Sequence, residues 1–291
     1  MTAPPFDPTA FKAQQSRSWD AISAGWDTWQ DSFEAAAAPV TRLLLDLAGV
    51  RAGQRVLDLG CGVGEPAISA ARAVGPAGRV VGVDISPEMV ARAGRRASHL
   101  HQLVFRVADM ETVEAQPGTV DVVLSRWSLM FAVDRGAALR RAAEVLVPGG
   151  VLAAAVWAAP SENPLLRLGF EVISRHLALG DPAPGMPGPF AMADREVLVN
   201  EMLSAGFGEA TAHPVALRLR LSSPEAYARY TRAVTAPALL DRLRQLGADD
   251  GGVWAEVATA ARRFAAPGGG VAVPGQAICV RAVTAGPGGG G

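Results

Sequence analysis

The chain has 291 residues, of which 49% are hydrophobic and 19% charged, and its formal net charge at pH 7 is −1. This length and apolar content suffice for one large domain, or for a core with a modest cap. A charge so close to zero argues against a nucleic-acid partner, which needs a basic face. No apolar run reaches the roughly 18 residues of a membrane span.

The N-terminal sequence and the cysteines bear on the cellular compartment. Residues 1–7 lack a basic stretch followed by an apolar one, so no secretory signal is expected. Cys61 and Cys279 are the two cysteines, and they give neither a disulfide framework nor a zinc site. A reduced cytoplasm is therefore the expected compartment. Because no acidic triad has metal-ligand spacing, no metal requirement is predicted.

The first predicted element is a helix over about residues 9–48. Its apolar side chains recur at spacings of three, four and seven, at Trp19, Ile22, Trp26, Trp29 and Phe33. This spacing places them on one face of a helix. We expect that face to pack against the rest of the protein, and a lid over a ligand is the alternative.

Strands and helices then alternate. Five apolar runs are predicted as strands, at residues 56–59, 80–83, 103–107, 120–125 and 151–157. Helices are expected over about 65–74, from the N-cap Ser86, and from Asp134 to Val147, where Pro148-Gly149-Gly150 ends the last of them. Near-continuous apolar strands are typical of a parallel sheet covered on both faces, and the alternation predicts a doubly wound α/β fold.

Beyond Trp157 the alternation loosens. We expect a helix over 161–179, a loop over 181–189, a helix from Asp194 to Ala205 and a strand near 210–219. Ser223 begins further helices through about residue 264, and 271–273 with 276–283 form a closing hairpin or a bent last strand. The predicted segments are an N-terminal lid or packing segment (1–50), a core (51–158), a cap insertion (159–193), a core continuation (194–221), a helical cap (222–266), closing strands (267–285) and a disordered tail (286–291).

The glycine turn after the first strand indicates the cofactor. Gly60, Gly62 and Gly64 let a ligand approach the backbone closely, because no Cβ is in the way. A dinucleotide fingerprint needs its third glycine one place later, where this chain has Glu65, whose charge would repel a pyrophosphate. Asp58, just before the turn, suits an ammonium group. The pattern therefore favours S-adenosylmethionine (SAM), a cationic nucleoside without phosphate, over NAD(P).

Acidic and hydroxyl side chains occur at further strand ends. Asp84, Asp109 and Ser125 end the second, third and fourth predicted strands. Ligands of open α/β sheets bind outside the carboxyl ends of the strands. We therefore expect these residues to share one site with the glycine turn.

At this point the chain resembles a known family, the class I SAM-dependent methyltransferases, and within it the ubiquinone/menaquinone-biosynthesis type and its small-molecule relatives. The matching pieces are residues 56–67, 81–89, 108–110, 122–131 and 146–157. The resemblance implies a Rossmann-like sheet of seven strands whose last strand is antiparallel.

The resemblance also implies roles for individual residues. Asp84 would accept from the ribose hydroxyls, Asp109 from the adenine amino group, and Met110 would cover the adenine ring. Ser125 and Arg126 would border the methionine moiety and the reaction chamber, although Arg126 can equally be an ion-pair partner. The full cofactor set is Asp58, Gly60, Cys61, Gly62, Asp84, Ile85, Met89, Asp109, Met110, Ser125 and Arg126.

The expected reaction is methyl transfer from SAM to an oxygen or carbon of a small molecule, leaving S-adenosylhomocysteine (SAH). The apolar cap predicts a hydrophobic acceptor, aromatic or quinone- or polyketide-like, of secondary metabolism such as antibiotic biosynthesis. Trp26, Met130 and His176 are candidates for the substrate pocket, and His176 is the candidate base. The protein is expected as a monomer or homodimer without nucleic-acid or membrane partners. A SAM-binding protein with regulatory or non-methylating chemistry, and an NAD(P)-dependent oxidoreductase, are the alternatives.

Overall fold

A seven-stranded sheet forms the body of the protein. The computed structural model describes residues 6–180, 185–247 and 251–286. The strands are β1 (Arg55–Leu59), β2 (Arg79–Asp84), β3 (Leu103–Val107), β4 (Val120–Arg126), β5 (Leu146–Trp157), β6 (Phe207–Leu221) and β7 (Val271–Thr284), in the order β3-β2-β1-β4-β5-β7-β6. β1 to β5 are parallel, and β7 is antiparallel to both β5 and β6. The expected doubly wound, mostly parallel fold with an antiparallel last strand is confirmed.

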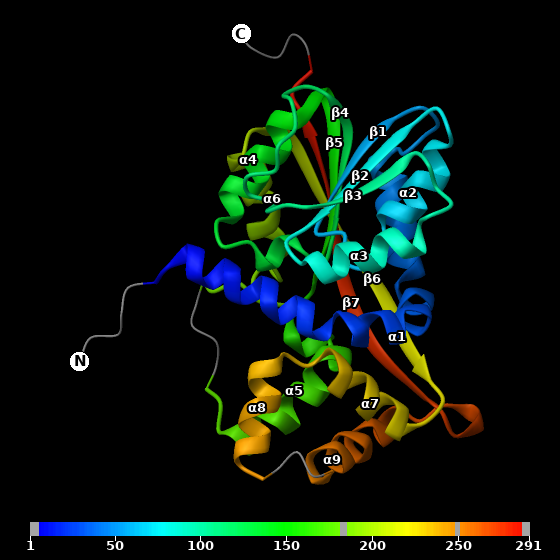
Figure 1. Cartoon of the computed structure of the whole chain (residues 1–291), viewed down its shortest axis with the longest axis vertical. Helices are drawn as coiled ribbons and strands as arrows, with labels where there is room; N and C mark the ends of the chain where they lie inside the picture. Colours follow the sequence, from blue (N-terminus) through cyan, green and yellow to red (C-terminus); the bar gives the residue numbers. More distant parts are fainter. Residues whose placement is uncertain (1–5, 181–184, 248–250, 287–291) are drawn as a thin grey trace.

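Helices cover the sheet on both faces. Figure 1 shows α2 (Ala67–Val74) and α3 (Pro87–Arg96) on one side, and α4 (Arg135–Val145) and α6 (Arg195–Ser204) on the other. Three helix starts are those that the sequence predicts: the side chains of Ser86, Asp134 and Asp194 accept backbone N–H groups in the first turns of α3, α4 and α6.

Two boundaries differ from expectation. The helix α4 ends at Val145 rather than Val147, and β5 begins at Leu146. Val120 of β4 pairs with Leu146 and Val122 with Val151, so Pro148-Gly149-Gly150 lie in a bulge within the strand, where Gly149 has φ +75°.

The closing segment is one strand rather than a hairpin. In β7, Pro274 pairs with Arg218 of β6. Pro274 lies past the end of β5, whose Trp157 pairs with Ala277, so β7 has a strand on one side only at this point. Proline is tolerated there because it interrupts no second ladder.

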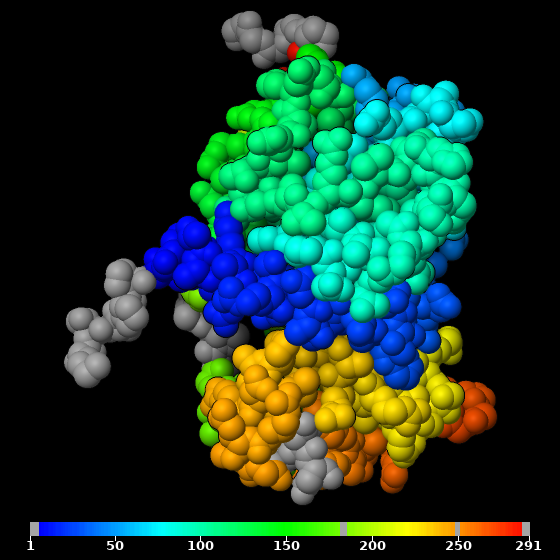
Figure 2. All heavy atoms as spheres, viewed as in Figure 1, coloured from blue at the N-terminus to red at the C-terminus, as the bar shows by residue number. Residues whose placement is uncertain are grey.

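The first helix, α1 (Pro8–Ala48), separates two parts of the molecule. It has 41 residues, begins at the N-cap Asp7 and ends at Gly49 in the left-handed conformation. Figures 1 and 2 show α1 as a blue belt between the sheet and a lower group of helices. The expected N-terminal helix is confirmed, and its first half crosses the carboxyl edge of the sheet.

The lower group of helices is assembled from two stretches of chain. It contains α5 (Pro164–Leu177), which follows β5, and α7 (Pro224–Val234), α8 (Pro237–Gln245) and α9 (Gly252–Ala261), which lie between β6 and β7. Tyr227 of α7 is fully buried, and its hydroxyl donates to the carbonyl of Leu165 in α5 at 2.8 Å. We call α5 and α7–α9 the helical cap. Short 3-10 turns lie at Leu129–Phe131, Pro160–Glu162, Arg262–Phe264 and Pro267–Gly269.

Some expectations fall partly outside the described residues. These are residues 1–5 of the expected N-terminal segment, 181–184 of the expected loop, 248–250 of the expected helical cap and 287–291 of the expected tail. Within the ranges that the structure describes, no helix has both the length and the apolar character needed to cross a bilayer.

Candidate functional site

A cavity of about 290 Å³ lies at the carboxyl edge of the sheet, beneath α1. The segments that follow β1, β2, β3, β4 and β5 all contribute to its wall. One end is lined by the glycine turn and the ends of β2 and β3. The other end, which we call the chamber, is lined by α1, the ends of β4 and β5, α5 and α7. The chamber residues are Trp26, Gln30, Phe33, Glu34, Arg126, Trp127, Trp157, Leu166, Tyr230 and Val234.

The glycine turn is joined directly to the aspartate that ends β2. Gly60 has φ +72°, and a Cβ there would lie 2.2 Å from the Cβ of Ser128, so only glycine fits. The amides of Gly60 and Cys61 donate to the carbonyl of Val83 at 2.8 and 2.9 Å. The amide of Gly62 donates to Asp84 Oδ2 at 2.9 Å. The turn and the second-strand acid therefore form one wall of one cavity.

Asp84 is fixed between two elements. Its Oδ1 accepts from the amide of Ser86 at 2.9 Å, while Oδ2 accepts from Gly62. Burial raises the pKa of Asp84, and the two backbone N–H groups oppose that rise. Each oxygen keeps a further lone pair, so the carboxylate can still accept from a ligand hydroxyl.

Asp58 lies behind the turn and does not line the cavity. Its Oδ2 accepts from the amide of Ala67 at 3.2 Å, and Oδ1 is buried without a hydrogen-bond partner. Burial raises the pKa of Asp58 to about 8, and the positive charge of Arg126 opposes this rise. An unpartnered buried carboxylate oxygen beside a glycine turn fits a cationic ligand, such as the ammonium group of SAM.

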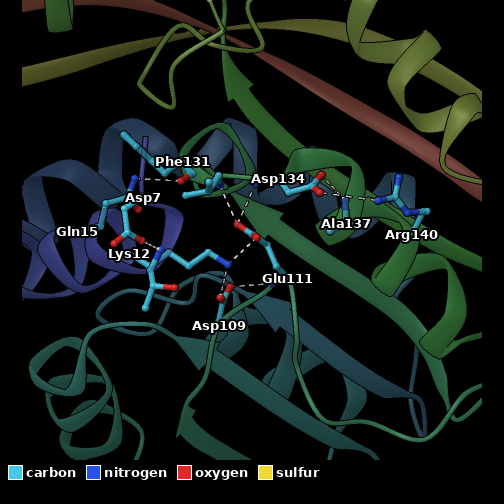
Figure 3. A network of polar contacts seen from close by, with 11 residues as sticks. Asp7, Lys12, Gln15, Asp109, Glu111, Phe131, Asp134, Ala137 and Arg140 are labelled. Atoms are coloured by element: carbon cyan, nitrogen blue, oxygen red, sulfur yellow. Dashed lines mark hydrogen bonds and ion pairs between the residues drawn. The ribbon is translucent and has the colours of Figure 1, made fainter. Parts of the chain in front are cut away.

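The predicted adenine residues share the same end of the cavity. Ile85, Met89, Asp109 and Met110 all line it. Figure 3 shows the Nζ of Lys12, on α1, between the carboxylates of Asp109 and Glu111, at 2.6 and 2.5 Å. The carboxylate of Glu111 in turn accepts from the amide of Val133 at 2.7 Å. The only lysine of the chain thus lies at the edge of the cavity.

Ser125 is not placed as expected. Its hydroxyl is buried and shares a hydrogen bond with that of Ser128, which also donates to the carbonyl of Leu59. Ser128 lines the cavity and Ser125 does not. Successive side chains of a strand point to opposite faces. At the end of β4 the hydroxyl of Ser125 therefore bonds to that of Ser128 and does not face the cavity.

Arg126 is an ion-pair partner that also lines the cavity. Its guanidinium forms a bidentate ion pair with Glu34 of α1, in which Nη1 lies 2.7 Å from Oε2. It also donates to the hydroxyl of Thr41 at 2.6 Å. The pair is largely buried and ties α1 to the end of β4. Arg126 therefore combines the two roles that the sequence left open.

Aromatic rings form the chamber walls. Four of the six tryptophans line the cavity, namely Trp19, Trp26, Trp127 and Trp157. Trp127 stacks on Trp157, with ring centroids 4.4 Å apart and planes 10° from parallel. Trp127 has φ +57°, which bulky side chains rarely adopt and which is typical of functional sites. Met130 also lines the cavity, so the structure brings two of the three predicted pocket residues to it.

His176 is the third predicted pocket residue, and its placement is a correction. It lies in the last turn of α5 and does not line the cavity. Its Nε2 is 2.9 Å from Glu256 Oε1 of α9, on the outer side of the cap. The sequence predicted the helix but not the face that His176 occupies.

Several residues of the cavity are not among those predicted from the sequence. Gln30 and Glu34 follow Trp26 at intervals of four, so the helical spacing was a usable signal for both. Lys12 and Tyr230 carried no such signal, because their places depend on how α1 and the cap pack.

Comparisons with known proteins show the family of this chain. A family model described as a methyltransferase domain matches residues 56–150. The chain is 34% identical to the aklanonic acid methyltransferase DauC of Streptomyces sp. (strain C5), over 50% of this chain and 66% of that protein. It is 30% identical to the ubiquinone/menaquinone biosynthesis C-methyltransferase UbiE of Hahella chejuensis, over 57% of this chain and 68% of that protein. The chain belongs to the class I SAM-dependent methyltransferases.

The likeness has defined limits. Matched stretches span from 34% to 68% of the length of the curated relatives. Among solved structures, the [4+2]-cyclase SpnF has a TM-score of 0.60 at 20% identity, covering 98% of this chain and 100% of that one. A likeness at that identity shows the fold alone.

Proposed function

We propose that this protein transfers a methyl group from SAM to an oxygen or carbon of a hydrophobic small molecule, aromatic or quinone- or polyketide-like, in secondary metabolism. One observation carries the proposal: a single cavity joins the glycine turn and Asp84 at one end to an aromatic chamber at the other. The first end suits a nucleoside without phosphate, and the second suits a planar apolar acceptor.

The cofactor end offers a partner for each polar part of SAM. Gly60 and Gly62 allow close approach of the methionine end, and Asp84 accepts from the ribose hydroxyls. Asp58, behind the turn, favours the ammonium through its charge when it is ionised, not by lining the cavity. Ile85, Met89 and Met110 provide an apolar bed for adenine, with Asp109 at its edge. Glu65, which also lines the cavity, would oppose a pyrophosphate and so weighs against the oxidoreductase alternative.

Bound SAM supplies a methyl group activated by its sulfonium. The contribution of the chain is to bring an acceptor atom in line with that methyl and to exclude water. Charge is dispersed as the acceptor's electrons are shared, so an apolar chamber need not oppose the reaction. Because His176 lies outside the cavity, the acceptor is proposed to ionise without it.

The relatives support the acceptor class. One is described by its name as acting on aklanonic acid, and the other as a C-methyltransferase of ubiquinone and menaquinone biosynthesis. Both descriptions agree with the aromatic walls of the chamber, and together they leave the acceptor atom open.

A second candidate function is SAM-assisted chemistry without methyl transfer. The [4+2]-cyclase SpnF shares the fold of this chain, and one fold can support more than one reaction. The ionisable side chains of the chamber are the paired Arg126 and Glu34 and the buried Tyr230, and they are compatible with either activity.

The test is to incubate the protein with SAM and a panel of hydroxynaphthoquinones, and to measure both SAH release and a methylated product by mass spectrometry. We expect both SAH release and a methylated product. We also expect Asp84→Asn to weaken SAH binding, measured by calorimetry, about 10- to 100-fold, because hydrogen bonds to a charged group contribute that much to affinity. Asp121→Asn is the matched control, because Asp121 forms a surface ion pair with Arg55 away from the cavity. SAH binding without any product would favour the second function, and unaltered binding by Asp84→Asn would contradict the proposed site.

The compartment and assembly complete the proposal. Both cysteines are buried and free, which agrees with a reduced cytoplasm. We propose a cytoplasmic monomer or homodimer whose partner is the small-molecule acceptor, without nucleic-acid or membrane partners.

A further inference from the structure

Unpartnered hydrogen-bond donors gather in the chamber. Across the part of the chain that the structure describes, seven buried side-chain polar atoms lack a hydrogen-bond partner. Four of them are N–H donors of residues that line the chamber, at Trp26 Nε1, Gln30 Nε2, Arg126 Nε and Trp127 Nε1. Buried donors are nearly always satisfied in folded proteins, so four in one cavity indicate a ligand that accepts hydrogen bonds.

Three of these side chains form one cluster. Trp26 and Trp127 both pack edge-on against Phe33, with ring centroids 5.1 and 5.2 Å apart. Gln30 lies four residues after Trp26 on α1, and therefore on the same face. Gln30 is 2% exposed, which leaves its Nε2 no access to bulk water. The three side chains thus lie around Phe33 in the chamber wall, and each carries an unpartnered N–H group.

The chamber offers these donors little competition from protein acceptors. Both carboxylate oxygens of Glu34 are held by the guanidinium of Arg126. Tyr230, which closes the chamber from α7, packs edge-on to Trp26 at 6.5 Å and is buried. Burial raises the pKa of Tyr230, so its phenol stays neutral. Neither Glu34 nor Tyr230 is hydrogen-bonded to the three donors, so an acceptor on a ligand would satisfy them.

The shape of the chamber narrows the ligand class. The stacked pair of Trp127 and Trp157 forms a flat wall, and Phe33 and Trp26 meet at right angles nearby. Flat aromatic walls favour a planar ring, and N–H donors favour an oxygen attached to it. The Arg126–Glu34 pair is neutral as a whole, so both a carbonyl and an ionised oxygen are accommodated.

We propose that Trp26, Gln30 and Trp127 form an oxygen-recognition subsite that determines which acceptors the enzyme binds. Their N–H groups donate to a quinone carbonyl or to an enolate or phenolate oxygen of a planar substrate. The subsite selects ring systems that present such an oxygen over hydrocarbons of the same shape. This inference rests on the proposed function and specifies its substrate class.

The test compares two probes with the same fused rings. The affinities of 2-hydroxy-1,4-naphthoquinone and naphthalene are measured by equilibrium dialysis, with and without saturating SAH. The wild-type protein is expected to prefer the quinone by at least about tenfold. Trp26→Phe and Gln30→Leu each remove one donor and should lower quinone affinity about five- to tenfold, the worth of one neutral hydrogen bond. SAH affinity should not change, and naphthalene affinity should fall less than quinone affinity.

Trp29→Phe is the matched control. Trp29 lies on the same helix, does not line the cavity, and packs edge-on to Tyr230 with ring centroids 6.0 Å apart. The control should keep the preference for the quinone. Gln30→Glu provides a second variant, which places a carboxylate toward the ligand oxygen and should weaken the quinone more than Gln30→Leu does.

The outcomes separate this inference from the proposed function. Equal affinity for the two probes, no binding of either, or donor variants that behave like Trp29→Phe would each overturn the subsite while SAH still binds. Failure of the wild-type protein to bind SAH would instead contradict the proposed function, and the dialysis without SAH would still report on the subsite.

Discussion

Asp58 shows how one buried carboxyl group can couple cofactor binding to the release of a proton. Its pKa is raised to about 8 by burial, against an ordinary value of 3.8. A raised pKa means that the protonated form stabilises the fold. That stability is complete below about pH 4 and is lost as the pH rises toward and through 8. A cation beside the glycine turn would favour the ionised form and so release a proton.

The first prediction concerns this proton. SAH binding at pH 7, measured by calorimetry in buffers of different ionisation enthalpy, is expected to release up to about one proton, because its ammonium lowers the pKa of Asp58. Asp58→Asn should abolish the release and keep the bond to the amide of Ala67. It should also be more stable than wild type at pH 9, by an amount on the order of a few kcal/mol, and not at pH 4.

A different outcome would identify another group as the source of the proton. Proton release that persists in Asp58→Asn would assign it to another group, and Asp84, whose pKa is also raised by burial, would be the next to test. A thermal-unfolding series from pH 4 to pH 9 would show whether the variant's advantage grows with pH, as the sign of the shift requires.

At the scale of elements, α1 is fastened across the sheet edge by polar contacts with three different segments. The hydroxyl of Ser16 donates to the carbonyl of Ile85 at 2.9 Å. Asp20 accepts from the amide of Glu88 at 3.0 Å, in the first turn of α3. Lys12 reaches Asp109 and Glu111 beyond β3. Together with Trp19 and Trp26 in the cavity wall, these contacts hold α1 over the cavity, where we propose that it acts as a lid.

The second prediction tests Lys12 as the fastening of that lid. Lys12→Met removes both ion pairs, which are partly exposed, and should therefore cost no more than about 1 kcal/mol of stability. The dissociation of SAH, followed by stopped-flow fluorescence, should become several-fold faster, because α1 opens more readily over the adenine end. Lys12→Arg, which keeps the charge, is the control. An unchanged dissociation rate in Lys12→Met would show that α1 does not gate the cavity.

Elements also show where sequence reasoning succeeds and fails. Ser86, Asp134 and Asp194 mark helix starts because a cap is a local interaction between residues a few positions apart. The end of α4 is misjudged because the bulge at Gly149 is created by pairing with β4, which sequence spacing does not reveal. The same division holds in the site: the turn at Gly60 is local, whereas the place of Lys12 depends on the packing of α1.

At the scale of the whole molecule, the cavity is completed by segments distant in sequence. The parallel strands bring the glycine turn and Asp84 to one edge, and this follows from the fold class alone. The chamber additionally needs α1 from the N-terminal part and α7 from between β6 and β7. The residues of the cap that face the cavity could not be assigned from the sequence, because they depend on how α5 and α7 pack against each other and against α1. For this reason Tyr230 was missed and His176 was chosen.

The third prediction follows from that arrangement of the cap. His176 is about one-third exposed and pairs with Glu256 between α5 and α9, outside the cavity. A base must lie within hydrogen-bond reach of the proton that it removes, directly or through one water. His176→Gln should therefore leave kcat and KM for a naphthoquinone that the protein methylates within about twofold of wild type. Loss of the exposed pair with Glu256 should lower stability by no more than about 1 kcal/mol. Rates measured from pH 5 to pH 9 should give the same profile for both proteins. A loss of tenfold or more in kcat, together with the disappearance of an ionisation near the usual histidine range, would mean that the cap closes far enough to bring α5 to the acceptor.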